Sequence, residues 1–86
     1  MLPIEEQRKI LLSIQEGFAN GSVTLGSVVK RLRNDVTGMT QDEFAEICHI
    51  SVRTLRQVEQ DEGNPTIKTL SSILSMFGMH FTVEAA

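Results

Sequence analysis

Residues 40–59 read TQDEFAEICHISVRTLRQVE, and the polar residues in this stretch predict two short helices joined by a tight turn. Thr40 and Glu43 form a capping box, in which the hydroxyl and the carboxylate each accept a hydrogen bond from a free backbone N–H at a helix start. Ser51 can cap a second helix through its hydroxyl. Because only about three residues separate Ile47 from Ser51, the pattern predicts a helix-turn-helix.

The second helix of this pair has an apolar inner side, formed by Leu55 and Val58, and a cationic outer side. The outer side carries Arg53, Arg56, Gln57 and Gln60, and residues 51–58 contain no acid. Arg can donate two hydrogen bonds to guanine, Gln can pair with adenine, and both reach phosphates. A solvated surface is the alternative, although such surfaces usually mix charges of both signs. We therefore interpret this side as one that reads DNA, despite a net charge of −3 for the whole chain.

Helical spacing of apolar residues continues toward the N-terminus. Pro3 can serve as the first residue of a helix over about residues 3–19, and a second helix, capped by Thr24 or Ser22, follows over about residues 24–36. The apolar residues expected to be buried by these two helices and by the first helix of the pair are Leu11, Ile14, Phe18, Leu25, Val28, Val29, Leu32, Val36, Phe44, Ile47 and Cys48.

The spacing of apolar residues changes between the last predicted helix and the tail after it. A stripe of apolar residues at helical spacing predicts a final helix, with Thr66 or Asn64 as its N-cap and Gly78 at its end. Its members are Ile67, Leu70, Ile73, Leu74 and Phe77. Residues 79–84 then alternate between apolar and polar, which is the period of a strand. A lone strand lacks a partner, so we expect the same strand of a second copy to pair with it across a two-fold axis, and the alternative is a tail that packs as an extended cover or frays.

Size and composition place these elements in one small domain. The chain has 86 residues, and we expect a single domain over residues 1–86, with an N-terminal helix at 3–20, a helix-turn-helix domain at 24–78 and a dimerising strand at 79–84. One cysteine cannot close a disulfide within the chain, which favours a cytoplasmic protein. No apolar run approaches the roughly 18 residues of a membrane span, and the acidic N-terminus is unlike a secretory signal.

The sequence offers no arrangement that supports catalysis. Cys48 and His49 are neighbours on a helix, so their side chains point about 100° apart and do not form a nucleophile with its base. We interpret Cys48 as a buried structural thiol. Two histidines and one cysteine without clustered spacing make no metal site, and no glycine-rich loop could cradle a phosphate. We therefore expect no enzyme, no cofactor and no metal.

The helix-turn-helix stretch resembles the Cro and phage-repressor class of DNA-binding proteins, the XRE family. The resemblance covers about residues 24–78 and includes the Thr-Gln opening, the small Ala45 where two helices touch, and the later Gly-Asn-Pro-Thr and Leu70. The ending, from Leu70 through Phe77 and Gly78 to Val83, is similar to HipB-type antitoxins, in which a C-terminal strand pairs between subunits. The resemblance implies an all-α, five-helix fold of the lambda-repressor kind with a short C-terminal β-strand.

This resemblance also implies a function. Members bind double-stranded DNA as dimers on a pseudo-palindromic operator, usually repress transcription, often of their own gene, and would be found in the cytoplasm on the nucleoid. Three hypotheses follow: a sequence-specific repressor, an antitoxin whose main partner is a toxin protein held by surfaces such as the acidic first helix, or a helix-turn-helix scaffold that has lost DNA binding. The last is motivated by the net negative charge.

Carried over residue by residue, the resemblance implies the DNA contacts. Gln41 would touch a phosphate at the start of its helix, and Val52, Arg53 and Gln57 occupy base-facing positions. Val52 is a departure, because polar residues are frequent there; it would either meet a thymine methyl or belong to the core. The residues that would meet the DNA backbone or neighbouring bases are Ser51, Thr54 and Arg56.

Three further positions are interpreted as structural. His49 stands where the family usually has glycine, in a turn that needs a left-handed conformation. Glu59 lies toward the interior, where the family pairs a glutamate with an arginine of an earlier helix, and Arg33 is the candidate partner. The loop from Asp35 to Met39 is expected to be one residue longer than usual.

Overall fold

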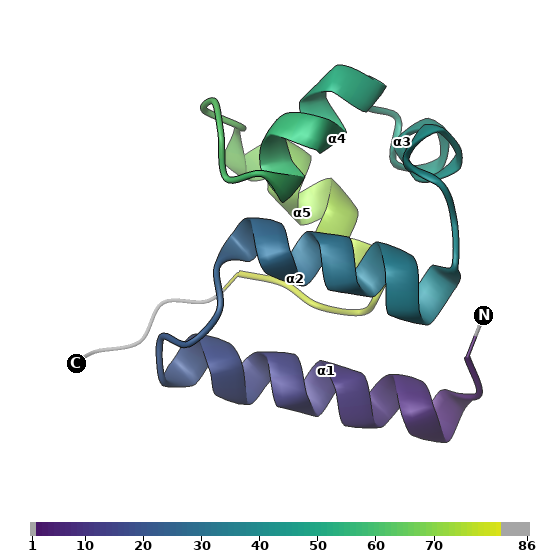
Figure 1. Ribbon diagram of the computed structural model, residues 1–86, viewed down its shortest axis with the longest axis vertical. Coiled ribbons are helices and arrows are strands. Elements are labelled where there is room, and N and C mark those ends of the chain that lie inside the picture. Colours follow the sequence, from purple (N-terminus) through teal and green to yellow (C-terminus); the bar gives the residue numbers. More distant parts are fainter. Residues whose placement is uncertain (1, 82–86) are drawn as a thin grey trace.

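The computed structural model describes residues 2–81, and within that range the regular structure is entirely helical (Figure 1). Along the chain the elements are α1 (Ile4–Ala19), α2 (Leu25–Arg31), the π-helix η1 (Leu32–Thr37), α3 (Gln41–Cys48), α4 (Val52–Glu59) and α5 (Ile67–Ser75). α4 packs against both α2 and α3, so the two helices of the predicted pair are in contact with each other and α4 is in contact with the helix before them. The all-α expectation is thus confirmed for the described residues.

Four helices begin at a hydroxyl cap, as the sequence predicts. The side chains of Thr24, Thr40, Ser51 and Thr66 each accept a hydrogen bond from the backbone N–H three residues later. The alternatives Ser22 and Asn64 do not cap a helix. At Thr40 the box is reciprocal, and its hydrogen bonds, first of all that from the backbone N–H, lower the pKa of Glu43. Pro3 is the residue before α1 rather than its first residue.

The second predicted helix changes type halfway along. From Leu32 to Thr37 it is a π-helix, in which the Gly38 N–H donates to the Arg33 carbonyl five residues back at 2.9 Å. A π-turn holds one more residue than an α-turn. Gly38 ends the π-helix at φ +67°. The expectation that the segment from Asp35 to Met39 is one residue longer than usual stays a prediction.

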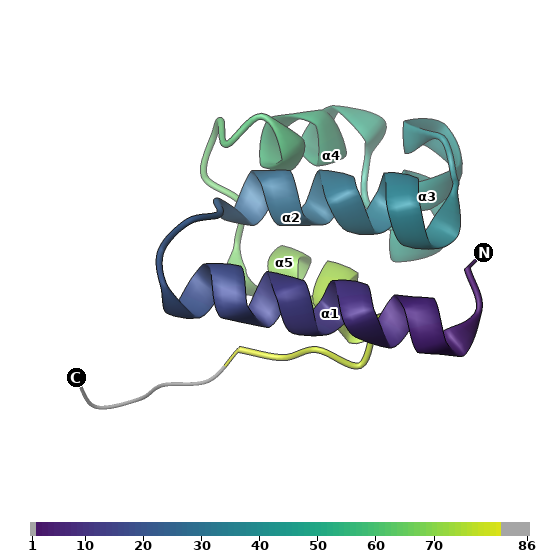
Figure 2. The same ribbon diagram turned by 60° about the horizontal axis from the view of Figure 1, so that its bottom comes forward.

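The core consists of two apolar clusters. One lies beneath the helix-turn-helix and includes Phe44, Leu55 and Ile73, with the Phe44 ring stacked on Phe77 at a centroid distance of 6.1 Å. The other joins α1 to α2, η1 and α5, and its members are Ile14, Val28, Leu32, Val36 and Leu74. Figure 2 shows α1 lying alongside α2 and α5, so the N-terminal helix is part of the same folded unit.

Three expected core residues are exposed. Phe18, in the last turn of α1, is 39% exposed because it borders an open hollow rather than the packed core. Ile47 is 46% exposed because α3 packs through Phe44, Ala45 and Cys48, and Ile47 points roughly 100° away from the middle of that side. Ile67 is 72% exposed because it is the first residue of α5, one turn before that helix reaches the core at Leu70.

The segment after α5 is extended and irregular. Gly78 ends the helical region at φ +70°, and the Met79 N–H donates to the Leu74 carbonyl at 3.1 Å. Residues 79–81 form no strand within the single chain, and the rest of the predicted strand, 82–84, lies outside the described residues. A strand that pairs only with a second copy has no partner within one chain, so this pairing stays a prediction.

No helix between residues 2 and 81 has the length and hydropathy that crossing a membrane requires.

Candidate nucleic-acid interface

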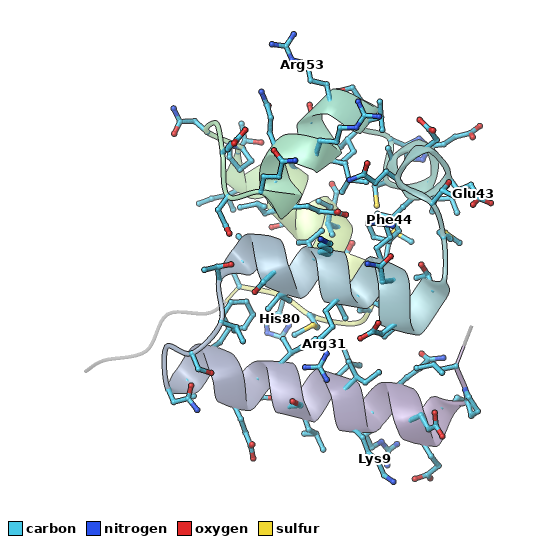
Figure 3. The ribbon with its side chains drawn as sticks, in the orientation of Figure 1. Lys9, Arg31, Glu43, Phe44, Arg53 and His80 are labelled. Carbon is cyan, nitrogen blue, oxygen red and sulfur yellow. The ribbon has the colours of Figure 1, made fainter. Side chains whose placement is uncertain are left out.

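α4 lies at one end of the molecule with its outer side uncovered. Its inner side buries Leu55 and Val58, as predicted, and Arg53 points away from the body of the domain (Figure 3). Arg53, Arg56 and Gln60 are exposed, which leaves a polar and cationic row along the helix. The row has the residue types and the access that DNA recognition needs.

The two arginines on this row are not neutralised. The ion pairs among residues 2–81 join Arg31 to Asp35 at 3.6 Å and Arg33 to Glu59 at 2.7 Å, and neither includes Arg53 or Arg56. Since binding to phosphate depends on unpaired positive charge, this side of α4 can bind an anionic partner.

The other residues at α4 that are predicted to contact DNA also make contacts within the protein. Val52 is half-buried and packs against the Phe44 cluster, which favours a core role for much of its side chain. Ser51 and Thr54 share a hydrogen bond between their hydroxyls at 2.8 Å at the helix start. Gln57 is half-buried, and its amide lies against Gly63, where an added Cβ would sit 3.3 Å from its oxygen.

Gln41, predicted to touch a phosphate, is joined to two other side chains. Its amide NH₂ donates to Oε1 of Glu59 at 3.1 Å, and its amide oxygen accepts from Nε of Arg56 at 3.3 Å. The first residue of α3 therefore connects the interior to the outer side of α4.

The predicted Arg33–Glu59 pair forms and is buried. Nε and Nη2 of Arg33 donate to the two carboxylate oxygens at 2.7 and 3.0 Å, and each residue is only 8% exposed. Nη1 of Arg33 also donates to the Met39 carbonyl at 3.0 Å. The hydrogen bond with Glu59 raises the pKa of the Arg33 guanidinium, and burial opposes that shift. The pair fixes the C-terminal turn of α4 to η1.

The turn between α3 and α4 has the expected conformation. His49 adopts φ 58° and ψ 40°, in the left-handed region, and its N–H donates to the Glu46 carbonyl at 3.2 Å. The Ile50 N–H donates to the Ala45 carbonyl at 3.0 Å. His49 thus occupies the position that a glycine would usually take.

Residues 29–83, which include both helices and this turn, match the helix-turn-helix family. The chain belongs to the helix-turn-helix family. The match supports the Cro and repressor type of the motif, a family of DNA-binding domains that regulate transcription. No curated protein and no solved structure gave a significant match to the chain. In this helix-turn-helix domain α4 takes the place of the recognition helix.

A second attachment of the recognition helix was not predicted. Asp61, just beyond α4, adopts φ 56°, and its carboxylate accepts from the Gly26 N–H and from the Thr24 hydroxyl, both at 2.8 Å. A Cβ on Gly26 would lie 2.4 Å from the Val58 carbonyl oxygen, so the backbones of α2 and α4 touch there. The one local signal was that aspartate tolerates a left-handed turn better than most residues. Its distant partners leave no mark in the sequence.

Other reactive and charged residues of the helix-turn-helix domain lie away from this outer side of α4. Cys48 is buried, burial raises the pKa of its thiol, and the sulfur lies 3.1 Å from that of Met76. Within residues 2–81 no group of three metal-ligating side chains gathers. Lys30 is exposed, whereas Arg31 contacts Asp35 and Ser13.

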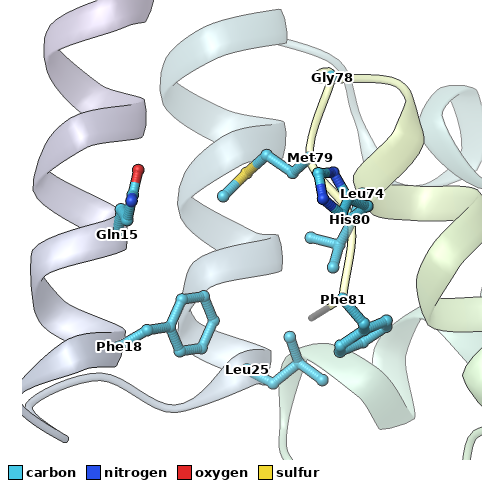
Figure 4. A pocket seen from close by; sticks show the side chains of 8 residues that line it. All are labelled: Gln15, Phe18, Leu25, Leu74, Gly78, Met79, His80 and Phe81. Carbon is cyan, nitrogen blue, oxygen red and sulfur yellow. The ribbon is translucent and has the colours of Figure 1, made fainter. Parts of the chain in front are cut away.

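A hollow of about 540 Å³ lies between α1, the start of α2 and the C-terminal segment (Figure 4). Its walls are mainly apolar and include Phe18 of α1, Leu25 of α2, and Met79 and Phe81 of the tail. Phe18 and Phe81 remain 39% and 45% exposed. The tail therefore begins against the body of the helix-turn-helix domain.

Proposed function

We propose that this protein is a sequence-specific transcriptional repressor that binds a pseudo-palindromic operator as a dimer and represses its own gene. The observation that carries the proposal is the outer side of α4, where Arg53 and Arg56 are exposed and have no carboxylate partner among the described residues. The residues proposed to contact DNA are Gln41, Ser51, Val52, Arg53, Thr54, Arg56 and Gln57. Val52, Ser51, Thr54 and Gln57 would contribute only their exposed parts.

Arg53→Ala tests the recognition role. The substitution removes the side chain that projects furthest from the body in Figure 3, and we expect it to cost about 1–3 kcal/mol of binding free energy, concentrated at one base position. Binding to the DNA upstream of the protein's own gene is measured over a range of salt concentrations, and affinity should fall steeply as salt rises.

Lys9→Ala is the matched control for Arg53→Ala. Lys9 lies on α1 at the opposite end of the molecule, so the variant loses one positive charge and should bind as the unaltered protein does (Figure 3). Equal affinity for every duplex would remove the specificity from the proposal. Failure to bind any member of a random duplex library would leave the scaffold hypothesis in its place.

Dimerisation through residues 79–84 is proposed separately. Deleting residues 79–86 is expected to give monomers in analytical ultracentrifugation, because the paired strand is lost. Met79 packs against the α1–α2 cluster, so Phe81→Pro and Thr82→Pro are tested as well; each leaves Met79 in place but removes a backbone N–H. Successive N–H groups of a strand point in opposite directions, so one of the two should weaken the dimer. Dimers that survive all three changes would place the interface elsewhere.

A second candidate function is binding a toxin protein through α1. Ile4 and Leu12 of this helix are 75% and 56% exposed among charged residues of both signs, which are Glu5, Arg8, Lys9 and Glu16, and α1 precedes the residues that match the family. Apolar side chains rimmed by charge are typical of protein contact sites. Co-expression with the product of an adjacent gene would show a stoichiometric complex, and Leu12→Glu should disrupt it.

A further inference from the structure

A chain of hydrogen bonds runs from the buried ion pair to the outer side of the recognition helix. Oε1 of Glu59 accepts from Nη2 of Arg33 at 3.0 Å and from the Gln41 amide NH₂ at 3.1 Å. The Gln41 amide oxygen accepts from Nε of Arg56 at 3.3 Å. The four side chains come from η1, α3 and α4, and they lead from a buried carboxylate to an exposed guanidinium.

The direction of this chain is fixed by its buried end. Glu59 is paired with Arg33 and can only accept hydrogen bonds, so Gln41 presents its NH₂ group to that carboxylate. The amide oxygen of Gln41 then points the other way and can only accept. A flipped amide would set oxygen against carboxylate and NH₂ against guanidinium, and both contacts would be lost.

Arg56 is oriented in this way without losing its charge. Its Nε is held by a neutral oxygen, and its two terminal NH₂ groups have no hydrogen-bond partner among residues 2–81. A carboxylate at the position of Gln41 would hold the guanidinium equally well but would neutralise it. The free edge of the guanidinium has the planar geometry that matches the paired oxygens of a phosphate.

We propose that Gln41 is a positioning residue, which holds the Arg56 guanidinium ready for a phosphate of the bound DNA. The proposal rests on the proposed DNA-binding function and changes the part that Gln41 plays in it, because Gln41 acts through Arg56. Holding the long side chain in place before binding reduces the entropy lost when the complex forms. The Arg33–Glu59 pair thereby supports DNA binding at a residue that it does not touch.

The first experiment uses the free protein and needs no DNA. The NMR signal of the Arg56 Nε–H should be shifted and protected from exchange with water, and Gln41→Ala should abolish both effects. Gln60→Ala is the matched control, because it removes an exposed glutamine of the same region and leaves the contact intact. An Arg56 signal that is identical with and without the Gln41 side chain would overturn the proposal.

The second experiment is a double-mutant cycle on operator affinity. Gln41→Ala should weaken binding by about 2- to 10-fold, which is the cost of ordering one long side chain. Arg56→Ala should weaken it further and reduce the salt slope by about 0.9, whereas Gln41→Ala should leave that slope unchanged. In the Arg56→Ala background, Gln41→Ala should have no added effect.

The outcomes separate this proposal from the proposed function. Additive losses in the cycle would show that Gln41 contacts DNA directly, and would overturn the positioning role while DNA binding stands. If the unaltered protein binds no duplex, the proposed function fails, and the NMR result alone decides whether Gln41 holds Arg56. Thermal unfolding of each variant shows whether it is folded at the temperature of measurement.

Discussion

Glu59→Ala should lower the free energy of unfolding by about 3–5 kcal/mol, because it leaves the Arg33 guanidinium buried without its counter-charge. Arg33 is 8% exposed, and two of its hydrogen bonds end on this carboxylate. Gln41 would lose its acceptor at the same time. Urea unfolding followed by circular dichroism measures the loss. Operator binding should weaken only to the extent that the domain unfolds or that Arg56 loses its support.

Two comparisons make this result interpretable. Glu62→Ala removes an exposed glutamate just beyond the same helix and should change stability by less than about 0.5 kcal/mol. The double variant Arg33→Met/Glu59→Leu replaces both charges with apolar groups and should be more stable than Glu59→Ala. If Glu59→Ala is no more destabilising than Glu62→Ala, the ion pair does not hold α4 in solution.

Among substitutions that add one methyl group, Gly26→Ala should be the most destabilising. We expect it to lower the free energy of unfolding by about 3 kcal/mol or more. The new Cβ would lie 2.4 Å from the Val58 carbonyl oxygen and 2.6 Å from the Asp61 carboxylate. The first of these is backbone, so α4 has to move away from α2, and the hydrogen bond from the Gly26 N–H to Asp61 would be lost.

Gly17→Ala is the matched control, because Gly17 is also buried in a helix. Its new Cβ would meet the Val23 side chain at 2.8 Å, and that side chain is only half-buried and can shift. Alanine is also the better helix former by about 1 kcal/mol, which offsets part of the strain. Thermal and urea unfolding compare the two variants. Equal stability of the two would mean that α2 and α4 are not in backbone contact.

The sequence predicts those features of the fold that depend on residues close together along the chain. The capping hydroxyls of Thr40 and Ser51 marked the two helices of the motif, and the apolar spacing of Leu55 and Val58 gave the buried side of α4. The Arg33–Glu59 pair followed from a family resemblance together with the position of each residue on its helix. These features depend on neighbours in sequence or on a known arrangement.

What escaped prediction depends on how helices approach one another. Ile47 has the spacing of a buried residue, yet α3 packs through Phe44, Ala45 and Cys48 and leaves it exposed. The contact of Asp61 with Gly26 spans 35 residues, and no periodicity connects them. The hydrogen bond between Gln41 and Arg56 likewise forms because folding brings the start of α3 next to the middle of α4.

The recognition helix is tied to its neighbours at its C-terminal end, where Glu59 pairs with Arg33 of η1 and Asp61, just beyond the helix, binds the start of α2. This end of the helix cannot move away from η1 and α2 without breaking a buried ion pair or the hydrogen bonds of Asp61 with Thr24 and Gly26. In the proposed dimeric repressor, a signal that releases the DNA would therefore act by changing the spacing of the two domains along the duplex, or by covering them, rather than by moving this end of α4.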